Sequence, residues 1–432
     1  MYPNLYFALK QWFGVEWQWA RIFNSFGLLL ALSFVCAAIV LHKEFKRKKA
    51  QGFFEPMYDT VVVGKPASIA ELLVQFIVGF FIGYKFIGGF VDGGLQLNAQ
   101  SYIASKQGNI WCGLAIGAVF TYLKWHEKNK QKLDVPITKK IALWPHDRVG
   151  DITILAAISG LLGAKFFHFL ENWSTFIKDP WGNITAFGGL TFYGGLIVAA
   201  IVLLWYAYSK KIPWKHLVDA VAPGLMIAYA VGRLGCQISG DGDWGIFNSA
   251  YISTPDAKVV LADSTNNFDK ALTKNAEYTQ YFNRIKEELA IVPHKSFAAP
   301  SYLPTWLVAM NYTHNVNEEG VRISNSKEEQ FATMLPVPVF PTPLYEFVIC
   351  SILFLILWLR RKAITTPGVL FGIYLMMNGA ERFIVEKIRV NTEYHLLGFR
   401  PSQAELISTA LFVLGAVIIW RCKAKKTNPQ TA

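Results

Sequence analysis

The sequence contains few charged residues for its length, and this shortage excludes an ordinary soluble enzyme. Only 17% of the 432 residues are Asp, Glu, Lys or Arg, whereas 53% are hydrophobic and 15% are aromatic. Soluble domains carry about 25% charged residues. We therefore expect a polytopic membrane protein. In such a chain, the formal net charge of +12 is better explained by basic cytoplasmic loops than by a nucleic-acid partner.

Paired cysteines are also missing. The five cysteines occur singly in or beside apolar segments, with no spacing typical of a disulfide framework or a zinc site: Cys36, Cys112, Cys236, Cys350 and Cys422. No metal or cofactor is expected. The N-terminus lacks a short apolar core followed by a small-residue cleavage site, so we interpret it as a retained interfacial segment rather than a signal peptide.

Long apolar runs predict nine transmembrane helices. They lie at about 22–41, 70–91, 109–124, 150–170, 187–208, 217–238, 343–360, 367–388 and 403–420. Basic clusters, such as HKEFKRKKA after the first run and RCKAKK after the last, are expected in the cytoplasm. An outside N-terminus and an inside C-terminus place every basic cluster there. The predicted fold class is an all-α polytopic membrane protein.

One long stretch, residues 246–340, has no spanning run. It is rich in Asn, Ser, Thr and Pro, and its charges are near balance. We predict a small extracytoplasmic head inserted between two membrane parts, 1–245 and 341–432. Within it, FNRIKEELA at 282–290 has helix-like spacing. A rigid lid and a protein-docking surface are both open as roles for this head.

The most unusual segment is VGRLGCQISGDGDWG, residues 231–245, where an apolar run meets an arginine, several glycines and two acids. An arginine inside a span is costly and normally has a partner or a task. Arg233 with Gly232 beside it predicts a site for a lipid phosphate, which a planar guanidinium binds well. The alternative is an arginine that reaches the interface or pairs with a carboxylate to join two helices.

The predicted topology brings other polar residues to the same outer membrane depth. Arg382, Glu386 and Arg389 are spaced i, i+4 and i+7 and so share one helix face. Together with Arg233, they carry more positive charge than Glu386 alone neutralises, which favours an anionic ligand. Three further acids keep a self-neutralised structural network open as an alternative: Asp241, Asp243 and Glu346.

Five blocks together resemble the prolipoprotein diacylglyceryl transferase family. GRLGCQISGDGDWG is similar to its Gly-Arg-x-Gly signature, GGLTFYGGLI to its GG-x-x-F-H-GGL block, and PTPLYEF to its P-S-Q-LYEF block. ERFIVEKIR and SQAELIS resemble its FR-x-x-VE-x-x-R block and the entry of its last helix. The blocks occur in the family's order.

The resemblance implies an enzyme of the bacterial cytoplasmic membrane. It would transfer the diacylglyceryl group of phosphatidylglycerol to the lipobox cysteine thiol of a prolipoprotein and release glycerol phosphate. Carried over by residue, Arg233 would hold the phosphate with help from Gly232, Gly194, Gly195 and Arg389, and Arg382 would assist the leaving group. Glu346 and Glu386 would orient the arginines or share in proton transfer.

The chain departs from the family where the family has histidines. Tyr193 replaces one histidine and Phe340 the other, Cys236 replaces an asparagine, and Phe26 replaces a tyrosine. Tyr193 is the expected substitute donor, or else an interfacial aromatic anchor. Asp241 and Asp243 are the expected candidates for the base that the acceptor thiol needs.

Two other functions remain open from the residues alone. A transporter or channel for an anionic substrate would also use ionisable residues and glycines within spans. Against it, the two halves show no repeat, and the polar residues gather near the outer surface. A membrane scaffold presenting the head would explain residues 246–340 but not the arginines.

Overall fold

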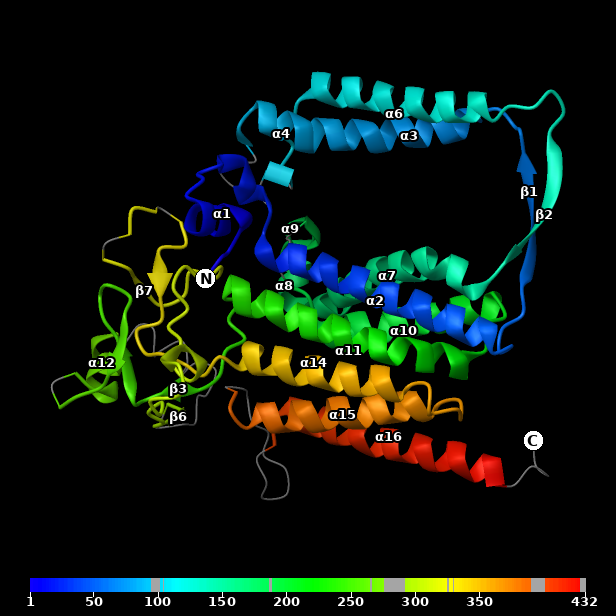
Figure 1. The fold of residues 1–432 in the computed structure, drawn as a ribbon. Helices are drawn as coiled ribbons and strands as arrows, with labels where there is room; N and C mark the ends of the chain where they lie inside the picture. Colours follow the sequence, from blue (N-terminus) through cyan, green and yellow to red (C-terminus); the bar gives the residue numbers. More distant parts are fainter. Residues whose placement is uncertain are drawn as a thin grey trace. The chain divides into compact units, whose positions relative to one another are not determined.

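The chain is mostly helical in a computed structural model (Figure 1). The structure describes residues 1–94, 102–103, 105–185, 189–264, 266–275, 292–324, 326–328, 330–389 and 401–427. These residues form two compact units. The first comprises 1–15, 23–41 and 215–432, and the second comprises 16–22 and 42–214. Each unit is described by itself.

The first unit contains most of the long helices of the C-terminal half. Its helices are α1 (Leu5–Phe13), the first part of α2 (Ser25–Ala50), α11 (Trp214–Ser239), α12 (Phe268–Lys274), η4 (Thr305–Leu307), α14 (Thr342–Arg360), α15 (Val369–Glu386) and α16 (Gln403–Thr427). Its strands are β3 (Phe247–Asn248), β4 (Tyr251–Ser253), β5 (Val259–Leu261), β6 (His294–Lys295), β7 (Val321–Arg322) and β8 (Thr333–Met334).

The second unit contains the remaining elements. Its helices are η1 (Gln18–Ile22), the end of α2, α3 (Ile69–Phe81), the π-helix η2 (Ile82–Ile87), α4 (Gly88–Val91), α6 (Ile110–Lys130), η3 (Pro145–Arg148), α7 (Val149–Glu171), α8 (Trp173–Lys178), α9 (Pro180–Thr185) and α10 (Phe192–Ser209). Its strands are β1 (Met57–Val63) and β2 (Ile137–Leu143).

All nine runs predicted to span the membrane are helical, which confirms a polytopic membrane fold. Seven of the described segments are long and apolar enough to cross a membrane: 25–50, 69–91, 145–171, 192–209, 214–239, 342–360 and 403–424. The other two predicted spans correspond to α6 and α15. α15 holds Glu381, Arg382 and Glu386 within 18 residues, so its apolar character is interrupted at its outer end.

Helix boundaries differ from the prediction at the basic clusters. α2 continues through HKEFKRKKA to Ala50, and α16 continues through RCKAKK to Thr427. Lys and Arg have high helix propensity and favour the last turns, where the helix dipole is negative. The basic residues therefore extend these helices beyond the apolar run instead of ending them.

Glycines pack the helices of the second unit closely together. A Cβ at Gly83 of α3–η2 would lie 2.3 Å from the Cys112 carbonyl oxygen of α6, and one at Gly79 would lie 2.9 Å from the Ile116 oxygen. α7 and α10 meet in the same way, because a Cβ at Gly163 would lie 2.7 Å from the Gly194 oxygen. Small residues let backbones approach where lipid supplies no hydrophobic drive.

A two-stranded antiparallel ribbon in the second unit was not predicted. β1 and β2 pair from Met57 opposite Leu143 to Val63 opposite Ile137. Most of their side chains are exposed on both faces. The sequence shows no regular alternation of apolar and polar residues here. The hydrophobic pattern therefore did not predict these strands.

In the first unit, α11, α14 and α15 share an apolar core. Its buried residues are Met226, Ala230, Cys350, Leu357 and Leu370. α15 also lies beside α16 (Figure 1), where a Cβ at Gly379 would be 2.5 Å from the Ser408 oxygen. These contacts hold the three helices whose outer ends carry the predicted site.

The N-terminal end of α15 is fixed by a carboxylate from α11. The buried side chain of Asp219 accepts hydrogen bonds from the backbone N–H groups of Gly368 (2.8 Å) and Phe371 (2.9 Å). These N–H groups begin α15 and have no partner within the helix. Asp219 therefore caps α15 from a neighbouring helix, because Gly368 itself has no side chain to do so.

The head predicted at 246–340 belongs to the first unit. Its core is a buried cluster that includes Trp244, Phe247, Tyr312, Leu335 and Val337. Within the described part of the head, regular structure is limited to short two-stranded pairs and short helices. The predicted helix-like stretch at 282–290 lies outside the described residues.

The base of the head is joined to the end of α15. The Ile246 N–H donates to the Ile388 oxygen (2.9 Å), and the Gly245 N–H donates to the Phe340 oxygen (2.8 Å). Gly245 and Arg389 also form an antiparallel bridge. The chain thus enters and leaves the head directly beside the predicted site.

Candidate active site

A fully buried carboxylate, Glu346 of α14, lies at the centre of the predicted site. Its side chain has 0% exposure and pairs with three arginines. Arg382 Nη1 lies 2.9 Å from Oε1, while Arg233 Nε and Arg389 Nη1 lie 3.2 Å and 3.5 Å from Oε2. The Tyr229 hydroxyl donates a further hydrogen bond to Oε1 (3.0 Å). Buried charges persist only when paired in this way.

α11 presents two of these groups from one face. Tyr229 and Arg233 are four residues apart, so they are neighbours on the helix surface. The Arg233 guanidinium lies 5.3 Å from the centre of the Tyr229 ring, a cation–π distance. Tyr229 therefore contacts both the Glu346 carboxylate and the Arg233 guanidinium.

Arg382 is held between two carboxylates. It pairs with Glu346 and also with Glu386, whose Oε2 lies 3.3 Å from Arg382 Nη2. The i, i+4 spacing predicted this second pair. Glu386 in turn accepts a hydrogen bond from the Ser402 hydroxyl (2.6 Å) at the start of α16, so the network includes that helix as well.

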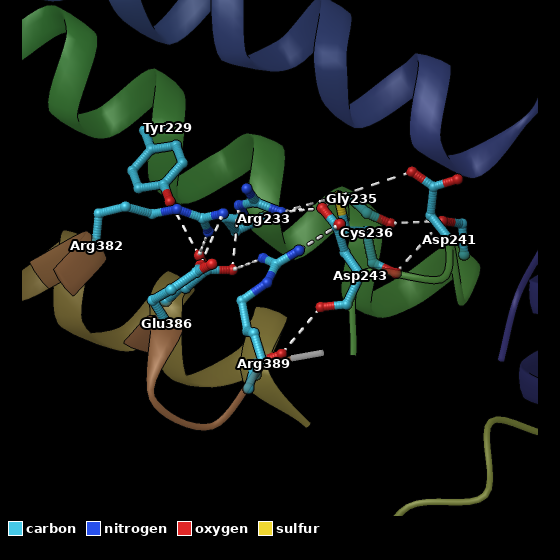
Figure 2. A network of polar contacts seen from close by, with 12 residues as sticks. Tyr229, Arg233, Gly235, Cys236, Asp241, Asp243, Arg382, Glu386 and Arg389 are labelled. Atoms are coloured by element: carbon cyan, nitrogen blue, oxygen red, sulfur yellow. Dashed lines mark hydrogen bonds and ion pairs between the residues drawn. The ribbon is translucent and has the colours of Figure 1, made fainter. Parts of the chain in front are cut away.

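Asp243 bridges two arginines at the outer side of the network. Its Oδ1 lies 2.6 Å from Arg389 Nη2, and its Oδ2 contacts Arg233 Nη1 (Figure 2). Its side chain is 37% exposed, against 0% for Glu346 and 2% for Glu386. Burial acts to raise the pKa of Asp243, but the guanidinium groups of Arg389 and Arg233 outweigh it and lower the pKa to about 2.

The loop that carries Asp243 requires glycine. Gly240 and Gly242 have φ values of 70° and 80°, a left-handed conformation that other residues adopt only at a cost. The first of these turns ends α11, and the N–H groups of Gly240 and Asp241 donate to the Cys236 oxygen. The Thr342 hydroxyl donates to the backbone carbonyl oxygen of Asp243 (2.9 Å). This hydrogen bond anchors the loop on α14.

Asp241 differs from Asp243 although it is only two residues away. It has no ion pair within hydrogen-bonding distance among the described residues, and its carboxylate Oδ2 lies 3.9 Å from the Cys236 sulfur. Burial, and then the negative charge of Asp243, raise the pKa of Asp241 to about 6. A carboxylate with this pKa is ionised at neutral pH and basic enough to accept a proton.

The network is charge-balanced by direct pairs. Three guanidinium groups, Arg233, Arg382 and Arg389, pair with three carboxylates, Glu346, Glu386 and Asp243. The predicted excess of positive charge beyond Glu386 is therefore taken up by Glu346 and Asp243. Asp243 is the most exposed of the three carboxylates.

The remaining predicted residues come from two places in the chain. Tyr193, Gly194 and Gly195 are at the start of α10 in the second unit. A Cβ at Gly195 would lie 2.7 Å from the Gly160 oxygen of α7, so the glycine pair has a packing reason for its small size. Gly232 is beside Arg233, and a Cβ there would meet nothing within 4 Å.

Sequence reasoning missed three polar members of the network: Tyr229, Ser402 and Thr342. Tyr229 had a detectable signal, since it lies four residues before Arg233 inside an apolar run. Ser402 and Thr342 precede or begin helices, which is common for hydroxyl residues and does not by itself indicate a site.

This chain resembles known proteins over most of its length. A family model described as prolipoprotein diacylglyceryl transferase matches residues 109–421. The chain is similar to the phosphatidylglycerol–prolipoprotein diacylglyceryl transferase of Bifidobacterium adolescentis, with 28% identity over 280 residues that cover 63% of this chain and 65% of that protein. It is also similar to the enzyme of the same name from Streptococcus pyogenes serotype M5, with 24% identity over 283 residues, 65% of this chain and 81% of that protein.

Proposed function

This chain belongs to the prolipoprotein diacylglyceryl transferase family, and we propose that the network around Glu346 is where it transfers a diacylglyceryl group from phosphatidylglycerol to a prolipoprotein. The family and the named relatives support this transferase activity and give no support to a transporter or channel. The observation that carries the assignment of the site is a single buried carboxylate that pairs with three arginines.

In the proposed reaction, the phosphodiester of the lipid takes the place of Asp243. The Asp243 carboxylate presents two oxygens to Arg233 and Arg389, and a phosphate can present two oxygens in the same way. Glu346 then keeps all three guanidinium groups aimed at the site while the lipid binds. Because the donors are positioned beforehand, they stabilise the charge that develops on the phosphate oxygen as the bond breaks.

The bond changes are those of a substitution at carbon. The thiolate of the acceptor cysteine attacks the glyceryl carbon, a carbon–sulfur bond forms, and the carbon–oxygen bond to phosphate breaks. Glycerol phosphate departs with the electron pair, and Arg382 is placed to neutralise it. We assign removal of the thiol proton to Asp241, because Asp243 is held ionised by two arginines and is a weak base.

Tyr193 is proposed as the hydroxyl donor that replaces the family's histidine. Tyr193→Phe removes one oxygen and keeps the ring. We expect turnover to fall about tenfold, the effect of losing one neutral hydrogen bond of about 1.4 kcal/mol, while expression and thermal stability stay unchanged. Full activity in this variant would leave Tyr193 as an interfacial aromatic anchor.

The multi-pass membrane assignment follows from the helices and the family. We further propose a bacterial inner-membrane location, with the N-terminus and the head outside, the C-terminus in the cytoplasm, and a lipobox cysteine as the acceptor. Reporter fusions near position 290 and at position 135 test this orientation. An inside signal near 290 contradicts it and also removes the site from the outer leaflet.

The decisive experiment for the site is Arg233→Lys. Lysine keeps the charge but cannot make a two-pronged contact to phosphate. We expect diacylglyceryl transfer to a lipobox peptide to fall by about 100-fold or more, on the order of the loss of one preorganised donor in other active sites.

Thermal stability of the same purified variant separates binding from structure. If Arg233 serves only to join helices, Arg233→Lys lowers stability, and removing the acid left unpaired restores it. A stable Arg233→Lys protein with near-normal transfer would falsify the phosphate role.

A further inference from the structure

An exposed aromatic loop in the head has no role in the proposed reaction. We define the aromatic loop as residues 297–308. Three of its side chains are exposed: Phe297 by 41%, Tyr302 by 84% and Trp306 by 53%. The surrounding stretch, 296–317, contains no Lys, Arg, Asp or Glu. The rest of the head carries charges of both signs, so this stretch differs from it in having no charged side chain.

The exposure of these aromatic side chains is built into the fold. The buried Asn248 side chain donates to the Phe297 oxygen (2.8 Å) and to the Val308 oxygen (3.1 Å), which ties together the two ends of the loop. The Ala299 N–H donates to the Tyr251 hydroxyl (2.8 Å). Leu303 and Leu307 pack inward against the head core. The loop thus buries its aliphatic side chains and presents its aromatic ones.

The loop lies at the outer end of a membrane span. The Tyr345 hydroxyl donates a hydrogen bond to the Leu307 oxygen, and Tyr345 is in the first turn of α14. α14 has 19 residues, which gives a length of about 28 Å at 1.5 Å per residue. This length is close to the hydrocarbon thickness of about 30 Å. The first turn of α14, and Leu307 with it, therefore lies at the outer boundary of the hydrocarbon.

We propose that the aromatic loop lies in the headgroup region of the outer leaflet and holds the head on the lipid surface. Trp and Tyr gather at this depth because their rings are apolar and their N–H and O–H groups stay hydrated. A protein partner is disfavoured, since the loop sits at the level of the headgroups and offers no charge to guide a partner to it.

This contact has a consequence for the active site. The head begins at Ile246 and ends at Phe340, and its base pairs with the backbone at Ile388 and Arg389. The lipid contact of the aromatic loop and the backbone contacts at the end of α15 would together fix the distance of the head from the network. The inference stands without the proposed reaction, because it concerns only the depth of the loop.

The test places a fluorophore at two exposed positions of the head. Trp306→Cys and Leu261→Cys are each labelled with an environment-sensitive dye, and the unsubstituted chain gives the background from its own cysteines. Leu261 on β5 is the control because it is 61% exposed and outside the aromatic loop. The full-length proteins are placed in phosphatidylcholine nanodiscs, which contain no phosphatidylglycerol.

We expect a dye at position 306 to be quenched by lipid carrying a nitroxide near the headgroup and to be shielded several-fold from aqueous iodide. The dye at position 261 should show the reverse pattern. Equal iodide quenching at both positions, with no quenching by the nitroxide lipid, overturns the proposal. So does a dye at 306 that becomes shielded only when a lipobox peptide is added, because that result assigns the loop to a protein partner.

Discussion

The molecule joins membrane helices in two different ways. In the second unit, α3 and α6 approach through Gly79 and Gly83, whose positions leave no space for a Cβ beside the neighbouring backbone. In the first unit, α11, α14 and α15 are joined instead by paired charges centred on Glu346. α15 and α16 meet through Gly379, so glycine packing also serves in the first unit.

The difference shows that this chain also joins helices without buried charge. Glycine packing stabilises a helix pair through van der Waals contact without burying charge, whereas a buried ion pair often contributes no more than an apolar replacement. If these charges serve to bind the anion of the proposed reaction, altering them should reduce transfer more than altering a packing glycine does. Four predictions test or sharpen this contrast.

The largest expected effect is that of Glu346→Gln. Removing this charge leaves three guanidinium groups that share a neutral acceptor, so we expect transfer to be abolished. Breaking a buried pair costs about 3–5 kcal/mol, and the free energy of unfolding should fall by this amount. Transfer and chemical denaturation are measured on the same preparation. Glu127→Gln is the control, because Glu127 is 53% exposed in its pair with Lys124 and exposed pairs contribute about 0–1 kcal/mol.

The next effect is on the pH dependence of transfer. If Asp241 accepts the thiol proton, activity should rise as the pH increases through about 6, where Asp241 ionises, and then level off. Asp241→Asn should remove this rise and lower activity at pH 7 by about 100-fold, the lower end of the range for a general base. The matched control is Asp256→Asn at an exposed position of the head. An unchanged pH profile in Asp241→Asn would assign the base to another group.

The same pKa also gives a stability prediction with a defined sign. The Asp241 carboxyl has a higher pKa in the folded chain than the ordinary value of 3.8, so the folded state binds more protons between pH 3.8 and about 6. Its contribution to stability therefore decreases as the pH rises through this window. Asp241→Asn should remove this decrease, which thermal unfolding at several pH values would detect.

The smallest expected effect on transfer is that of changing a glycine that packs one helix against another. Gly83→Leu forces a side chain against the Cys112 backbone, and overpacking of this kind costs about 1–3 kcal/mol. We expect a lower unfolding temperature but unchanged transfer per folded molecule, since no charge of the network is altered. Val78→Leu, at a 45% exposed position on the same helix, is the control. A loss of transfer greater than the loss of folded protein would show that the α3–α6 pair has a part in the reaction.

The long helices and the shared helix face of Arg382, Glu386 and Arg389 could be predicted from sequence. Each depends only on the spacing of residues within one segment. Apolar runs of span length indicate α2, α7, α10, α11, α14 and α16, and the spacing of Arg382 and Glu386 gives their ion pair directly. These features need only the chain's own periodicity and the cost of charge in hydrocarbon.

The family resemblance named Glu346 as a site residue, but its central position could not be predicted because it depends on contacts between distant segments. Nothing near Glu346 in the chain shows that three arginines converge on it. The separate environments of Asp241 and Asp243 are set by the left-handed turns at Gly240 and Gly242, which direct the two carboxylates differently. The β1–β2 ribbon was missed because its side chains are exposed on both faces.

Asp219 gives the site a mechanical property. It ties the N-terminal end of α15 to α11 through the Gly368 and Phe371 N–H groups, while Arg233, Glu346 and Arg382 connect the C-terminal ends of the same two helices. Sliding of α15 along α11 would break contacts near both ends of the helix pair. These two helices are therefore expected to move as one rigid pair. A lateral opening for a lipid would have to form between helices that lack polar contacts at both ends.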